Sequence, residues 1–227
     1  MGTAVLTCPA IKIVPPANYA ALDKSLRKLS SYDWLIFTSA NAVEYFMKRY
    51  LRLKITPNAL KTLKTCALGP LTAIALRQAK IPVSKISKNY VAESVLDALP
   101  SVRNMNILIP QAQEARKILS QELRKRGAKV DVVTAYRTVV DEPGAQAMRN
   151  LLSSRKVDCV TFTSSSTVKN FFLSAGGRPR GTLAASIGPI TTKTLLSYGW
   201  KPAIVARKPT TKHLAQAILN YFKKGIS

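Results

Sequence analysis

Short apolar runs alternate along this chain with longer segments in which apolar side chains recur every three or four positions. The short runs are typical of buried strands, and the recurrence is typical of amphipathic helices. Strands are predicted at 33–37, 65–68, 83–87, 106–109, 129–133, 158–163, 183–187 and 202–206. Helices are predicted at 19–29, 42–50, 72–79, 92–99, 114–126, 145–152 and 211–223, and from residues 167 and 190 onward. This alternation predicts an α/β fold with parallel, doubly wound sheets.

The sequence repeats itself at three turns, always in the same order. FTSANAV at 37–43 matches FTSSSTV 125 residues later, and CALGPLT at 66–72 matches ASIGPIT 119 residues later. YVAE at 90–93 and PTTK at 209–212, again 119 residues apart, each open a predicted helix. Three matched turns in one order indicate a duplicated α/β unit. We therefore expect two similar domains.

Two extended segments mark where the chain passes between these domains. Pro15 and Pro16 end an extended segment predicted at 5–14, and the β-rich TAYRTVV at 134–140 forms a second linker. We expect a discontinuous domain, 1–14 plus 140–227, and an inserted domain, 18–136. The linkers then lie near 11–17 and 134–140 and form a two-strand connection. Pro110 is expected to make the turn after the strand at 106–109.

Composition changes this picture in two ways. The net charge of +24 favours a polyanionic partner, namely nucleic acid, acidic lipid or a multiply carboxylated substrate, although the basic residues are dispersed. The chain has neither an apolar run long enough for a membrane span nor a secretory signal pattern. Cys8, Cys66 and Cys159 are scattered, with no disulfide or zinc spacing, and the last two fall in predicted buried strands. We therefore expect a cytoplasmic protein, and we expect a monomer.

The repeated turns carry the candidate chemistry. Each follows a strand and starts a helix, so free backbone N–H groups and the positive end of the helix dipole face a ligand above the sheet. The serines and threonines there either cap the helices or bind an anion. Ligands of such sheets bind at the carboxyl ends of the strands, where these turns lie.

The ordered phrases FTSANAV, LGPLTA, YVAE, AYRTV, FTSSSTV and IGPITTKTL resemble bacterial uroporphyrinogen-III synthase, from about residue 4 to the C-terminus. The resemblance implies a cyclising lyase of tetrapyrrole (haem, sirohaem and cobalamin) biosynthesis. Such an enzyme expels the hydroxyl of hydroxymethylbilane as water, inverts the last pyrrole ring and closes the macrocycle. The resemblance implies no metal or organic cofactor, and it suggests a transient handover from hydroxymethylbilane synthase.

The same resemblance assigns site residues. Tyr136, in AYRTV, matches the tyrosine proposed to assist departure of the hydroxyl; alternatively, it is a packed linker tyrosine. The residues that would bind substrate are Thr38, Ser39, Asn41, Gly69, Thr72, Tyr90, Val91, Ala92, Ser164, Ser165, Ser166, Gly188, Thr191 and Thr210. Lys169 and Lys193 are either carboxylate ligands or solvated surface charges, and His213, the single histidine, is either a proton carrier or a surface or packing residue.

Two departures from the family pattern stand out. Gln111 follows Pro110 where the family usually has arginine, and Arg116 is a possible substitute. Family members usually begin with a strand and helix ahead of the strand that corresponds to residues 4–10, so we expect this first β-α unit to be missing from the sequence. Either the true start lies upstream, or this copy has lost the unit. Two rival interpretations stay open: a degenerate relative that binds tetrapyrrole without turnover, and a basic nucleic-acid-binding protein.

Overall fold

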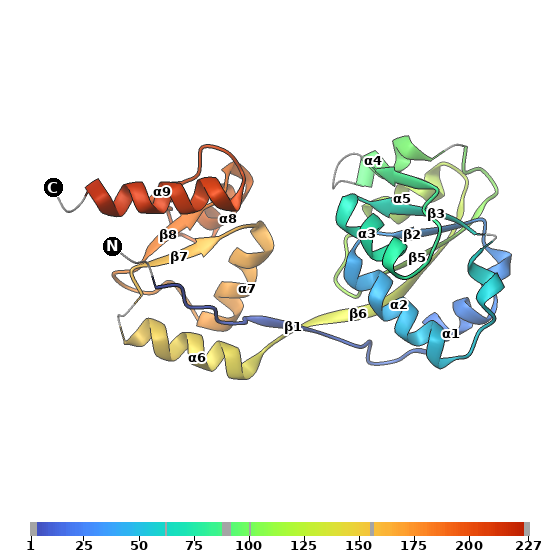
Figure 1. Ribbon diagram of the computed structural model, residues 1–227, viewed down its shortest axis with the longest axis horizontal. Helices are drawn as coiled ribbons and strands as arrows, with labels where there is room; N and C mark the ends of the chain where they lie inside the picture. The colour runs from blue at the N-terminus through green and yellow to red at the C-terminus, as the bar shows by residue number, and fades with distance from the viewer. Residues whose placement is uncertain (1–3, 62, 88–91, 100, 155–156, 225–227) are drawn as a thin grey trace. The chain divides into compact units, whose positions relative to one another are not determined.

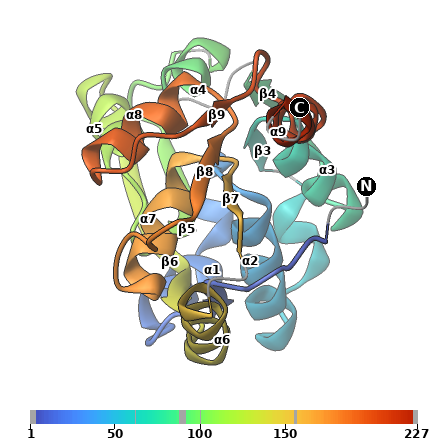
Figure 2. The ribbon, with the colours of Figure 1, turned by 90° about the vertical axis from the view of Figure 1, so that its left-hand side faces the viewer.

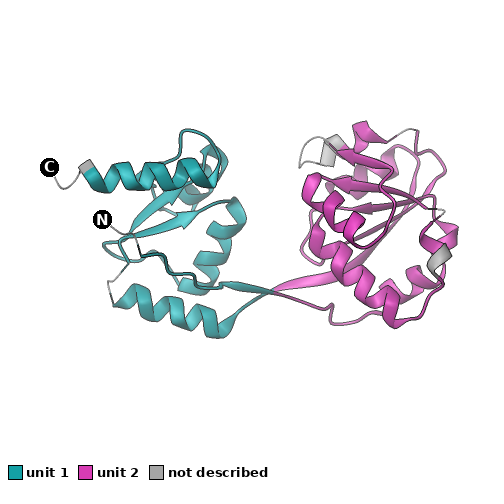
Figure 3. Cartoon of the chain, in the orientation of Figure 1, with its two compact units in different colours: residues 1–12, 139–227 teal, residues 13–138 magenta. Residues whose placement is uncertain are grey.

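A computed structural model describes residues 4–61, 63–87, 92–99, 101–154 and 157–224. The chain divides into two compact units, unit 1 with residues 1–12 and 139–227, and unit 2 with residues 13–138 (Figure 3). Strands β1 (Ile11–Val14) and β6 (Lys129–Val140), which lie next to each other in one sheet, carry the chain from one unit to the other (Figure 1).

Unit 2 is built on a sheet with the strand order β1-β6-β5-β2-β3-β4. Its other strands are β2 (Trp34–Phe37), β3 (Lys64–Leu68), β4 (Lys85–Ser87) and β5 (Asn106–Ala112). The strand β2 pairs in parallel with β3 and β5, and the β3–β4 and β5–β6 pairs are also parallel. The predicted parallel α/β fold is therefore confirmed for this unit.

Helices cover both faces of this sheet because the strand side chains alternate in direction. Leu35 and Phe37 of β2 belong to a core shared with α1 (Ala20–Arg27), α2 (Ala40–Arg52) and α3 (Pro70–Gln78). Trp34 and Ile36 belong to a second core, on the other face, shared with α4 (Ala92–Ala98) and α5 (Ile118–Lys125). Two short 3-10 helices, Leu29–Ser31 and Pro57–Leu60, lie in the connections.

Unit 1 repeats this plan with a parallel sheet of β7 (Cys159–Phe162), β8 (Leu183–Ser186) and β9 (Ile204–Val205). The helices are α6 (Glu142–Ser153), α7 (Ser165–Ala175), α8 (Pro189–Ser197) and α9 (Thr211–Lys224). Figure 2 shows α7 and α8 on one side of β7 and β8, with α9 on the other. One core holds Phe162 against Trp200 at 5.7 Å between ring centroids, and the core beneath α9 holds Leu214.

The N-terminal segment differs from its prediction. Residues 4–10 carry no regular secondary structure, and the strand begins only at Ile11. The Ala10 carbonyl instead accepts hydrogen bonds from the Asp141 N–H at 3.1 Å and the Ser174 hydroxyl at 3.0 Å. A Cβ on Gly144 would lie 2.0 Å from the Pro9 carbonyl oxygen. Close contacts with α6 and α7 therefore hold this segment in place of a strand ladder.

Three local predictions are also wrong. Pro110 lies buried inside β5, where the pairing with β2 has already ended at Leu108, so its missing N–H costs no ladder bond on that side. The helix expected from residue 114 begins at Ile118, after a turn. Cys159, predicted to lie in a buried strand, lies in β7 but is half-buried, whereas Cys66 is buried. The segment at 134–140, predicted as an extended and β-rich linker, forms the end of β6.

Candidate functional site

The first turn of unit 2 joins the end of β2 to the start of α2. Ser39 has extended backbone angles and its Oγ accepts a hydrogen bond from the Ala42 N–H at 3.1 Å, so Ser39 is the N-cap of the helix. Thr38 and Asn41 flank this cap and are half-buried. The cap fixes the Ser39 hydroxyl at the carboxyl end of a central strand.

Tyr136 meets this turn. Its hydroxyl lies 3.1 Å from the Ser39 Oγ, and the residue is 8% exposed. The alignment of β6 with β5 shifts between Gln111 and Ala112, which pair with Thr134 and Tyr136, leaving Ala135 as an extra residue. Such a bulge redirects side chains, and it explains why Ala135 and Tyr136 are both buried although strand side chains normally alternate. Tyr136, the predicted catalytic residue, is therefore within hydrogen-bonding distance of Ser39, a predicted substrate-binding residue.

Tyr45 completes this group and was missed by the sequence analysis. Its ring lies 5.9 Å from that of Tyr136, centroid to centroid, and its hydroxyl donates to the Ile13 carbonyl at 2.8 Å. The single signal in the sequence is a polar-tipped aromatic residue on a helix, which by itself does not distinguish a site from a core. The tyrosine pair forms because β6 passes α2 in the fold.

The second turn of unit 2 leads from β3 into α3. Gly69 is the N-cap with φ of +81°, a conformation that side chains other than glycine rarely adopt, and Pro70 starts the helix. The cap makes no side-chain hydrogen bond, so the N–H groups of Leu71 and Thr72 have no capping side chain. The Thr72 side chain is buried. At the third turn, Ala92 begins α4, while Tyr90 and Val91 lie outside the described residues.

In unit 1 the turn after β7 is closed by its own hydrogen bonds. Ser164 and Thr167 form a capping box at the start of α7, with each side chain accepting from the other's backbone N–H. The Ser165 hydroxyl shares a 2.7 Å hydrogen bond with the Thr194 hydroxyl on α8. Ser166 is exposed. Two of the three predicted serine hydroxyls are therefore already used within the fold.

The turn after β8 resembles that after β3. Gly188 caps α8 without a side-chain bond, and Thr191, like Thr72, is buried two residues beyond the helix-starting proline. The Gly188 N–H donates to the Ser186 Oγ at 3.4 Å, and the Thr192 hydroxyl donates to the same oxygen at 2.9 Å. This network fixes the backbone of the turn.

Most of the remaining candidates are exposed. Thr210 caps α9: its Oγ1 accepts from the His213 N–H at 3.3 Å and lies 2.7 Å from the His213 Nδ1. This gives His213 a structural partner on its own helix. Lys169, Lys193 and Arg116 are exposed, whereas Gln111 is buried.

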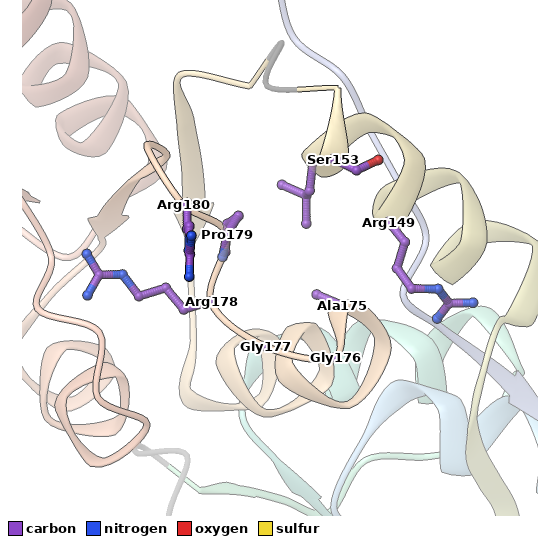
Figure 4. A pocket seen from close by; sticks show the side chains of 9 residues that line it. Arg149, Ser153, Ala175, Gly176, Gly177, Arg178, Pro179 and Arg180 are labelled. Atoms are coloured by element: carbon purple, nitrogen blue, oxygen red, sulfur yellow. The ribbon is translucent and has the colours of Figure 1, made fainter.

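A separate cavity of about 380 Å³ lies in unit 1, at the C-terminal ends of α6 and α7. Its lining includes Arg149, Arg178 and Arg180, but the first two side chains extend away from the hollow (Figure 4). Arg149 donates to the Ser174 carbonyl at 2.7 Å, and the Arg178 guanidinium lies 6.0 Å from the centroid of the Trp200 ring. These arginines stabilise the fold, and helix C-termini repel anions, so we do not assign the site here.

The charged pairs with shifted pKa values lie away from the turns. The Arg49 guanidinium holds the pKa of the Asp23 carboxyl below its usual value, and the Lys28 ammonium does the same for Asp131. Burial raises the pKa of the Cys66 thiol to about 11. None of these groups belongs to the turns described above. The turns instead present hydroxyl and backbone amide groups, and these suit the binding of carboxylates.

No helix in the described parts of the chain is both long and apolar enough to cross a membrane.

Known proteins resemble this chain over nearly its whole length. A family model described as uroporphyrinogen-III synthase HemD matches residues 1–216. The putative uroporphyrinogen-III synthase of Methanothermobacter thermautotrophicus is 32% identical, with 96% of this chain and 88% of the relative covered. The uroporphyrinogen-III synthase of Synechococcus elongatus is 29% identical, with 96% and 86% covered.

Solved structures share the fold. A mutant uroporphyrinogen III synthase from Thermus thermophilus has a TM-score of 0.67 at 22% identity, with 97% of this chain and 88% of the other covered. The enzyme from Helicobacter pylori has a TM-score of 0.66 at 20% identity, with 93% and 91% covered. The family model, the curated relatives and the fold agree, and the chain belongs to the uroporphyrinogen-III synthase family, an enzyme family of cyclising lyases.

Proposed function

We propose that this chain converts hydroxymethylbilane to uroporphyrinogen III, with Tyr136 and Ser39 at the reacting hydroxymethyl group. Membership of the family supports the reaction, and the 3.1 Å contact between the two hydroxyls is the observation that carries the assignment of residues. The contact lies at the carboxyl end of β2, where parallel sheets bind their ligands.

Departure of the substrate's hydroxyl group requires a proton at the leaving oxygen. The pyrrole nitrogen supplies the electron pair that breaks the carbon–oxygen bond, and a proton from the Tyr136 hydroxyl turns the departing hydroxide into water. Ser39 orients this hydroxyl, because its own Oγ is fixed by the Ala42 N–H. The cationic carbon then forms a bond with a carbon of the last pyrrole ring, which inverts before the macrocycle closes. The proton that this ring loses on closure restores the Tyr136 hydroxyl. A free tyrosine is a weak acid near neutrality, so we expect a modest contribution.

The carboxylates of the substrate would bind at the remaining turns. The uncapped N–H groups at the starts of α3 and α8 suit them, and so does the exposed hydroxyl of Ser166. Thr72 and Thr191 line these helix starts, with Lys169 and Lys193 available to longer arms of the substrate. Holding many carboxylates at once restricts the open chain, and ring inversion depends on that restriction.

The two units would be copies of one duplicated α/β domain, with linkers near 11–17 and 134–140. The equivalent caps at Ser39 and Ser164 support this proposal. We further propose that the protein works as a monomer in the cytoplasm, where its three free cysteines stay reduced, and that it receives its substrate from hydroxymethylbilane synthase in a transient handover.

The test is Tyr136→Phe, assayed with fresh hydroxymethylbilane under steady-state conditions. We expect kcat to fall roughly tenfold, since the proton donor is lost, with KM within about twofold. The matched control is Tyr50→Phe, which removes a buried hydroxyl that donates to the Thr56 carbonyl at 2.6 Å, away from the turns. An unchanged kcat for Tyr136→Phe, or an equal fall in the control, would remove Tyr136 from the chemistry.

A further inference from the structure

Two large apolar side chains are exposed at equivalent positions of the two units. Leu71 is 66% exposed and Ile190 is 78% exposed. Each is the second residue of its helix, α3 or α8, and the two stand 119 residues apart in the repeated Gly-Pro-apolar-Thr turns.

A single exposed leucine or isoleucine is ordinary on a protein surface. Here the same exposure occurs at the same turn in both copies of a duplicated plan. Neither side chain packs in the core of its own unit, because α3 contributes Ala73 and Leu76 to that core and α8 contributes Leu195. Exposure at both positions therefore calls for a partner outside the unit's own core.

The neighbouring groups indicate the chemistry of that partner. Each side chain follows a proline that starts an uncapped helix and precedes a buried threonine. The backbone N–H groups there suit a carboxylate, and the adjacent leucine or isoleucine suits an apolar surface. A pyrrole ring that carries acidic arms offers both within one molecule.

We infer that Leu71 and Ile190 each pack against a pyrrole ring of the substrate whose carboxylates bind the starts of α3 and α8. This inference rests on the proposed function and adds two residues to its substrate contacts. The two positions differ in one respect: Ile74, one turn after Leu71, is exposed and apolar, whereas the equivalent residue after Ile190 is Lys193. The contact at α3 is therefore wider and more apolar, and that at α8 has a cation beside it.

The experiment compares four single variants. Leu71→Gln and Ile190→Gln remove the apolar contacts, while Leu51→Gln and Leu173→Gln change leucines of similar exposure, 67% and 70%, that lie away from the helix starts. Steady-state kinetics with fresh hydroxymethylbilane give KM and kcat, and chromatography separates isomers I and III of the product. Thermal unfolding midpoints show whether the variants keep their folds.

We expect KM to rise about tenfold in Leu71→Gln and in Ile190→Gln with little change in kcat, because burial of such side chains is worth that much affinity. KM of the two control variants should stay within about twofold of the wild type. An unchanged KM at either helix start, or an equal rise in the controls, overturns the inference. Absence of isomer III with the wild-type chain overturns the proposed function itself, which separates the two failures.

Discussion

The hydroxyl groups of the two matched serine caps differ in what they contact. Ser39 caps α2 and lies 3.1 Å from the Tyr136 hydroxyl, so one oxygen serves both the helix and the neighbouring side chain. Ser164 caps α7 within a closed box, where Thr167 satisfies it. The same residue at the same turn is thus linked to candidate chemistry in unit 2 and serves only the helix in unit 1.

An ion pair in unit 2 gives a prediction for pH dependence. Arg49 donates from Nε and Nη2 to the two carboxylate oxygens of Asp23, at 2.6 and 2.5 Å, and lies over the Tyr19 ring. This pairing holds the Asp23 pKa below its ordinary value of 3.8 in the folded protein. The stabilisation is therefore present above the unfolded pKa, and it disappears as pH falls through the lowered folded value.

We expect Asp23→Asn to lower the free energy of unfolding by about 1 kcal/mol near neutral pH, and we expect this cost to shrink at an acidic pH below 3.8, as pH falls through the lowered pKa of Asp23. Urea unfolding at both pH values measures this difference. Glu44→Gln is the control, because its partner Lys48 and Glu44 itself are both exposed, and its effect should be smaller. A cost for Asp23→Asn that is the same at both pH values would contradict the assigned pairing.

The glycines that start α3 and α8 occupy matched turns with different backbones. Gly69 has φ of +81° and ψ of 168°, a region that residues with a Cβ avoid. Gly188 has φ of 173°, which is ordinary extended backbone, and a Cβ there would meet only the Pro209 Cβ at 3.4 Å. The same sequence signal therefore corresponds to a backbone that requires glycine at one position only.

We expect Gly69→Ala to destabilise the protein by about 1–3 kcal/mol, because alanine is strained at positive φ. Gly188→Ala should cost less than about 1 kcal/mol. Denaturant unfolding midpoints of the two variants give the comparison directly. Equal costs, or a larger cost at Gly188, would show that the matched turns do not differ as described.

Element order and parallel pairing could be read from the sequence because they depend on local periodicity and on helix-start chemistry. The caps at Ser39, Gly69 and Gly188 follow from residue types within one turn. Pro110 was misread because its place in β5 depends on where the pairing with β2 ends, which the local sequence does not encode.

The other features that the sequence did not predict depend on contacts between segments that are far apart in the chain. Tyr45 meets Tyr136, and Ser165 meets Thr194, only after the helices have packed. The family resemblance matched residues 4–10 to a strand, but these residues are instead held by the Asp141 N–H at the start of α6 and by the Ser174 hydroxyl of α7, which both donate to the Ala10 carbonyl. The candidate site was predictable turn by turn, whereas its internal hydrogen bonds were not.

At the scale of the whole molecule, net charge and family membership restrict the function to different degrees. A charge of +24 by itself favours any polyanion, and nothing in the structure explains its size. The match to the uroporphyrinogen-III synthase family over residues 1–216 narrows the function to one reaction class. The substrate of that class is itself a polyanion, so the charge and the family are compatible.

The most direct measurement supplies the purified chain with fresh hydroxymethylbilane and separates the products by isomer, next to a sample without protein. Without an enzyme this substrate closes spontaneously to isomer I, with no inversion of the last ring. Our account predicts that isomer III dominates when the chain is present. Isomer I alone, in the amount formed without protein, would contradict it and would favour a relative that binds tetrapyrrole without turnover.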